Sequence, residues 1–116
     1  MSIERLDIGP RMSQIAIHNN TVYLAGQVAE ANAGQGIAEQ TQEILDQIDS
    51  LLAQAGSNKS KLLSVTIYLA DITDFDGMNS VWETWIERDH PPARACVEAK
   101  LAGPEFIVEM TAIAAC

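Results

Sequence analysis

The sequence predicts an α+β two-layer sandwich, in which one mostly antiparallel mixed sheet carries two helices on one face, as in the chorismate-mutase-like fold. Three observations predict it: short runs of alternating apolar residues, two longer stretches with apolar residues at helical spacing, and turn residues between several of the runs. A chain of 116 residues is long enough for one hydrophobic core. We therefore expect residues 1–116 to form a single domain.

The N-terminal part of the chain predicts a short strand followed by a hairpin. Leu6 and Ile8 are separated by one polar residue, as in a half-buried strand. Residues 15–28 contain two alternating runs with Asn19-Asn20 between them, and asparagine tolerates the positive φ that a tight hairpin turn requires. Residues 31–36 have the composition of a loop.

Two helices are predicted, with one strand between them at residues 63–69. The first helix spans residues 37–55, and Gly56 is suited to cap its C-terminal end. The second helix starts near Asp74, and Pro91-Pro92 forbids its continuation. The apolar stripe of the second helix consists of Phe75, Met78, Trp82, Trp85 and Ile86.

Residues 93–100 and 106–114 predict the last two strands, joined by a turn at Gly103-Pro104. In an antiparallel hairpin Cys96 would lie opposite Glu109 and Arg94 opposite Thr111, all on one sheet face. That face would stay open to another subunit, while the small residues of the first strand would let a helix approach the other face. These small residues are Ala93, Ala95, Val97 and Ala99.

The charge and composition exclude several classes of function. A formal net charge of −9 opposes binding to nucleic acid and to anionic membrane surfaces, because both depend on lysine and arginine. No apolar run approaches the roughly 20 residues of a membrane span or the length of a signal peptide, so we expect a cytoplasmic protein. Two distant cysteines, Cys96 and Cys116, and two unspaced histidines do not form a zinc-ligand spacing, so no metal is expected.

Arg94 and Glu109 are the residues most suited to chemistry. Arg94 lies among small, largely apolar strand residues, where a guanidinium must find an anion. The spacing favours an ion pair with Glu98 or Glu109, and the functional alternative is a substrate carboxylate bound through two parallel hydrogen bonds. Glu109 either pairs with Arg94 or orients a water molecule. Cys96 has no histidine near it in sequence and is interpreted as a core residue rather than a nucleophile.

One longer segment is the most specific motif of the chain: Pro92-Ala93-Arg94-Ala95-Cys96-Val97-Glu98, followed by Glu109. Together with Ile8-Gly9-Pro10, Gly26-Gln27-Val28, and Asp74-Phe75 with Asn79, it resembles the Rid (reactive intermediate deaminase, or YjgF) family over nearly the whole chain. Each of the shorter segments is weak alone, and together they are convincing.

The resemblance implies a homotrimer with the sheets inside, the helices outside and a cleft between each two subunits. It implies hydrolysis of 2-imino acids and their enamine tautomers, such as 2-aminoacrylate and 2-iminobutyrate, to 2-keto acids and ammonia, without a metal or organic cofactor. The residue matching Arg94 binds the substrate carboxylate, and the residue matching Glu109 positions the attacking water. Gly26, Cys96 and Asn79 are carried over as further substrate-binding residues.

Two positions depart from the best-known deaminases of that family. Those proteins have a tyrosine after Gly-Pro, where this chain has Arg11-Met12, and a serine before Gly-Gln, where it has Ala25. The departures indicate a divergent branch with altered substrate preference or little deaminase activity. Arg11 either adds a second cation to the cleft or is a surface residue.

Two main hypotheses follow. The first is an imine and enamine deaminase, and the alternative is a non-catalytic or regulatory trimer that binds small carboxylates such as 2-keto acids. RNA cleavage, which is attributed to some relatives, is disfavoured by the negative charge.

Overall fold

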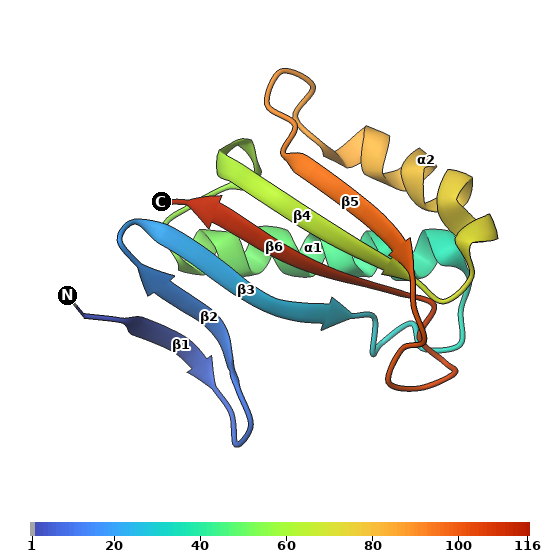
Figure 1. The fold of residues 1–116 in the computed structure, drawn as a ribbon, viewed down its shortest axis with the longest axis horizontal. Helices are drawn as coiled ribbons and strands as arrows, with labels where there is room; N and C mark the ends of the chain where they lie inside the picture. The colour runs from blue at the N-terminus through green and yellow to red at the C-terminus, as the bar shows by residue number, and fades with distance from the viewer. Residues whose placement is uncertain (1) are drawn as a thin grey trace.

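The computed structural model describes residues 2–116 as a six-stranded sheet with two helices against one face (Figure 1). The strand order is β1-β2-β3-β6-β4-β5, and all neighbouring strands are antiparallel except β4 and β5. The predicted α+β class is therefore confirmed. The elements are β1 (Glu4–Ile8), β2 (Ser13–His18), β3 (Thr21–Val28), α1 (Ile37–Gln54), η1 (Lys59–Lys61), β4 (Leu62–Leu69), η2 (Ile72–Asp74), α2 (Phe75–Trp85), β5 (Ala93–Glu98) and β6 (Val108–Ala115).

The hydrophobic core lies between the helices and the sheet, and strand alternation decides which residues enter it. On β6, burial alternates along the strand, so that Val108 and Met110 are fully buried while the residue between them is half-exposed. On β4, Val65 and Ile67 point the same way. Burying one such aliphatic side chain contributes about 1.5–3 kcal/mol, so this face holds the two layers together.

Several local predictions are confirmed. β2 and β3 form the expected hairpin, and Asn19 and Asn20 have φ values of 53° and 62°, as a tight turn requires. α1 begins at Ile37 and ends one residue before Ala55, and Gly56 follows it with a φ of 76°. In the second helix, α2 ends at Trp85, well before Pro91-Pro92.

The predicted hairpin between the last two strands is wrong. β5 is an edge strand parallel to β4, and β6 is inserted between β3 and β4 (Figure 1). Arg94 therefore pairs with Val65 and Cys96 with Ile67, rather than with Thr111 and Glu109. The physical reason lies in the connections, because α2 provides the long crossover that a parallel pair needs, while residues 99–107 are long enough to carry the chain past β4.

The predicted common face of Arg94, Cys96 and Glu109 is wrong for the same reason. Neighbouring residues on paired strands point to the same side, so Arg94 and Cys96 point to the helix side, like their partners on β4. The small residues of β5 face away from the helices, and Val97 among them is 44% exposed.

Glu109 lies on the sheet face away from the helices, which we call the open face. Along β4, its partner Tyr68 alternates with the buried residues, so both point away from the core. The open face carries Tyr23, Tyr68, Val97, Glu109, Thr111 and Ile113. Neither helix in residues 2–116 is long and apolar enough to cross a membrane.

Candidate functional site

Arg94 projects from edge strand β5 toward α2 and is held there by polar and aromatic contacts. Its Nη1 atom donates a hydrogen bond to Oδ1 of Asn79 over 2.7 Å. The guanidinium carbon lies 5.2 Å from the ring centroid of Trp82 and 5.8 Å from that of Phe75, within the range of cation–π attraction. We call Arg94, Asn79, Phe75, Trp82 and Cys96 the arginine half.

The guanidinium of Arg94 is exposed and has donors to spare. Within residues 2–116, its hydrogen-bonding partner is the neutral amide of Asn79 rather than a carboxylate. The predicted alternative of an ion pair with Glu98 or Glu109 is wrong, because Glu109 lies on the other face and Glu98 Oε1 accepts a hydrogen bond from the backbone N–H of Ile72 over 2.9 Å. An oriented guanidinium with free donors is suited to bind a planar anion through two hydrogen bonds.

Cys96 lies two residues along β5 from Arg94, on the same side of the sheet. Partial burial raises the pKa of the Cys96 thiol above its usual value of 9.0, and the charge of Arg94 offsets part of that rise. Only the thiolate is a strong nucleophile, so a raised pKa leaves less of the reactive form of Cys96 at neutral pH.

Glu109 and Gly26 come together on adjacent strands, although the chain separates them widely. A Cβ atom at Gly26 would overlap Oε2 of Glu109, so the carboxylate packs directly against the β3 backbone at Gly26. The register of β3 against β6 shifts between Leu24 and Gln27, which sets Gly26 within this irregularity. We call Gly26 and Glu109 the glutamate half.

A cavity of about 310 Å³ adjoins the glutamate half on the open face. Glu109, Tyr68 and Thr111 line it from the sheet, and residues 99–102 close one side. The carboxylate therefore borders a space that can hold a small molecule or water molecules.

A chain of glutamine side chains supports the irregular part of β3. Gln47 of α1 donates to Gln27 Oε1 over 3.0 Å, and Gln27 donates to Gln14 Oε1 over 2.9 Å. Gln27 is only 7% exposed, and both ends of its amide are bonded. The supporting role of Gln27 was not predicted; the detectable signal was a glutamine directly after Gly26 in a strand of mostly apolar residues.

Arg11 lies in the turn between β1 and β2, where the N–H of Gly9 donates to the carbonyl of Met12. This turn lies at the opposite edge of the sheet from β5 (Figure 1). Within one chain, Arg11 is therefore separated from the arginine half.

The two halves of the candidate site do not meet within one chain. Glu109 pairs with Tyr68 and Arg94 with Val65, so β4 lies between them and they are displaced along it. They also project from opposite faces of the sheet. The structure thus joins Arg94, Asn79 and Cys96 in one place and Gly26 and Glu109 in another.

Known proteins match this chain over a range that includes both the arginine half and the glutamate half. The family model described as endoribonuclease L-PSP matches residues 3–116. A "RutC family protein" of Haemophilus influenzae is 48% identical over 116 residues, covering 100% of both chains. NMB1025 of Neisseria meningitidis, a member of the YjgF protein family, superposes with a TM-score of 0.95 at 43% identity, covering 99% of this chain and 95% of that one. The chain belongs to the Rid (YjgF) family. The expected resemblance is therefore confirmed.

A second relative of this Rid protein is "RutC family protein YoaB" of Escherichia coli, 44% identical over 115 residues and covering 99% of both chains. The names RutC and YjgF are family labels and state no reaction, whereas the description of the family model names RNA cleavage. Within residues 2–116, no group of three histidine, cysteine, aspartate or glutamate side chains gathers to hold a metal ion.

Proposed function

We propose that this Rid protein hydrolyses 2-imino acids and their enamine tautomers to 2-keto acids and ammonia, in clefts between the subunits of a homotrimer. The observation that carries the proposal is the geometry of Arg94. Its guanidinium is oriented by Asn79 and two aromatic rings, yet no carboxylate among residues 2–116 is bonded to it. A substrate carboxylate would fill that role.

The separation of the two halves supports assembly. If the open face of one copy packs beside β5 and α2 of the next, Glu109 of the first approaches Arg94 of the second. Such a contact joins unlike surfaces, and three copies close it into a ring. The open face carries exposed apolar side chains that such a contact would bury, since Tyr23 is 47% exposed and Val97 44% exposed in the isolated chain.

The proposed reaction adds one water molecule and releases one ammonium ion. The water oxygen forms a bond to C2 of the protonated imine, and the electron pair of the C=N bond moves to nitrogen. The Glu109 carboxylate accepts a water proton and returns it to that nitrogen. The C–N bond of the resulting carbinolamine then breaks as its hydroxyl loses a proton, giving the keto acid and ammonia, which leaves as ammonium. An enamine substrate first takes up a proton at C3.

Few catalytic groups are needed because a protonated imine is already electrophilic. Arg94 would hold the carboxylate and so fix C2 relative to Glu109 of the neighbouring copy. Proximity and orientation of this kind lower a barrier without a strong nucleophile. Trp82 and Phe75 would keep the carboxylate end of the substrate dry, which strengthens its attraction to the guanidinium.

A second candidate is a trimer that binds 2-keto acids without catalysis. The specific observation in its favour is the loss of two polar groups, because Ala25 and Arg11-Met12 stand where the best-known deaminases have a serine and a tyrosine. RNA cleavage, which the family name mentions, is not proposed, since a net charge of −9 opposes binding to phosphates.

A coupled assay tests the proposal. A dehydratase or an amino-acid oxidase generates 2-aminoacrylate or 2-iminobutyrate in place, and keto acid release is followed with and without the Rid protein. Faster release that depends on protein concentration supports hydrolysis. Unchanged release with several imino acids, together with saturable binding of pyruvate, would instead establish the second candidate.

A further inference from the structure

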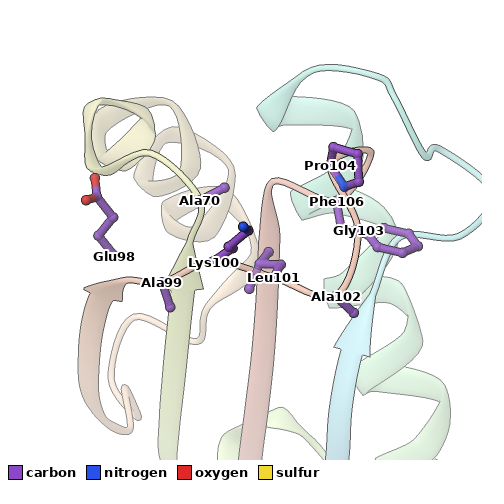
Figure 2. A pocket seen from close by; sticks show the side chains of 9 residues that line it. All are labelled: Ala70, Glu98, Ala99, Lys100, Leu101, Ala102, Gly103, Pro104 and Phe106. Atoms are coloured by element: carbon purple, nitrogen blue, oxygen red, sulfur yellow. The ribbon is translucent and has the colours of Figure 1, made fainter.

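One sizeable cavity has a lining that includes no residue of either half of the proposed active site. It is a cleft of about 730 Å³ at the end of β5, between residue 70 and the loop of residues 99–106 (Figure 2). Its volume falls within the range of small-molecule sites. Residues 99–102 separate it from the smaller cavity beside Glu109.

The walls of this cleft combine an apolar surface with two opposite charges. Leu101, Pro104 and Phe106 supply apolar surface, and Glu98 and Lys100 supply the charges. In Figure 2 the Glu98 carboxylate stands at one side of the cleft and the Lys100 ammonium nearer its middle, and they do not point at each other. Both side chains are exposed, so both are available to a ligand.

The Glu98 carboxylate is held in place by the protein itself. Its Oε1 atom accepts a hydrogen bond from the N–H of Ile72 over 2.9 Å, which fixes the side chain beside the cleft. The second oxygen is not used in that bond. A fixed carboxylate with a free oxygen is suited to accept hydrogen bonds from an ammonium group.

We propose that this cleft binds a free α-amino acid with an apolar side chain. The Lys100 ammonium would bind the ligand carboxylate, the free oxygen of Glu98 would bind the ligand ammonium, and the apolar wall would receive the side chain. The pair of opposite charges in the cleft favours such a zwitterion over a simple anion, because a simple anion would leave the Glu98 carboxylate facing no cation. A simple amine would leave Lys100 facing no anion.

The proposed amino-acid site is independent of the proposed deaminase function, since none of its lining residues belongs to the arginine half or the glutamate half. Amino acids are the chemical precursors of 2-imino acids by dehydration or oxidation. An amino-acid site beside the Glu109 cavity would let the concentration of the precursor regulate the hydrolysis of the reactive product. This regulatory role, unlike the binding itself, rests on the proposed function.

Titration of the ¹⁵N-labelled wild-type protein with L-leucine tests this, with backbone amide shifts as the readout. We expect saturable shifts within residues 99–106. Two analogues each lack one charge: 4-methylpentanoate has no ammonium and 3-methylbutylamine has no carboxylate. Each should bind at least about tenfold more weakly, as expected for the loss of a charge-assisted hydrogen bond.

Two single variants each remove one of the two charged groups that line the cleft. Glu98→Gln keeps an acceptor for the Ile72 N–H, and Lys100→Met keeps the aliphatic stem, so neither should disturb the fold. Each should weaken L-leucine binding at least about tenfold. Arg94→Ala is the control and should leave L-leucine binding unchanged. The proposal is overturned if no saturable shifts occur, if the singly charged analogues bind as well as L-leucine, or if Arg94→Ala abolishes binding while Lys100→Met does not.

Discussion

The carboxylate of Glu109 occupies the space that a side chain at Gly26 would need. The two residues lie on adjacent strands, and the irregular register of β3 brings them into contact. The position of the proposed catalytic carboxylate thus depends on a missing Cβ atom on the neighbouring strand.

Gly26→Ala should therefore displace the Glu109 carboxylate and lower kcat while the protein stays folded. A misplacement of about 1 Å costs up to about 10²-fold in rate, which sets the expected loss. Steady-state assays with 2-iminobutyrate, together with thermal melting, measure both effects. Gly103→Ala is the matched control, because the atoms nearest to its new Cβ belong to the exposed side chain of Glu105, and its kcat should match the wild type.

Arg94→Ala should abolish carboxylate binding at little cost in stability. Its exposed guanidinium makes one hydrogen bond and two cation–π contacts, worth together about 1–2 kcal/mol, and no buried carboxylate is left stranded. Arg94→Lys should rescue poorly, since an ammonium lacks the two-donor fork. Chemical denaturation and pyruvate titration of the three proteins measure these effects, and a loss of 3–5 kcal/mol, as for a broken buried ion pair, would contradict this account.

Cys96 should react with iodoacetamide more slowly than Cys116 at neutral pH. Partial burial raises the Cys96 pKa above 9.0, so less thiolate is present below that value, and the reaction should accelerate only as the pH rises through the raised pKa. Cys116 is exposed and serves as the internal control. Peptide mass mapping at several pH values distinguishes the two sites, and equal rates at pH 7 would show that Cys96 is not shielded.

Gln40 should contribute strongly to stability although it is polar. It is fully buried, its amide nitrogen donates to the carbonyls of Gln35 and Glu105, and its oxygen accepts from the N–H of Ile107. Gln40→Leu strands these backbone groups and should lower the free energy of unfolding by about 2–4 kcal/mol. Urea denaturation tests this with Gln42→Leu as the control, an exposed site whose side chain donates to Asp46. A loss of comparable size in Gln42→Leu would refute the assignment.

Local periodicity was enough to predict the first hairpin and α1, because both depend on residues close in sequence. The strand alternation of β6 was also predicted, with Glu109 on the face away from Val108. The partner of β5 was predicted wrongly as β6, because the short connection between the two strands favours a hairpin and local sequence does not show that α2 carries the chain across to the far side of β4.

The same limit applies to the candidate site. Motif resemblance identified Arg94, Asn79, Gly26 and Glu109, but their grouping into two separate halves depends on sheet order. The aromatic neighbours of Arg94 were missed as site residues, because the apolar stripe of α2 predicts only core. Trp82 is indeed 6% exposed, and it still presents its ring to the guanidinium.

Mixing two inactive variants tests most directly whether the site is built from two copies of the chain. Arg94→Ala and Glu109→Gln should each be inactive alone. When they are co-refolded in equal amounts, one cleft in four on average combines an intact arginine half with an intact glutamate half, so about a quarter of wild-type activity should return. Activity no higher than the sum of the separate variants, in mixed trimers verified by native mass spectrometry, would contradict the inter-subunit site.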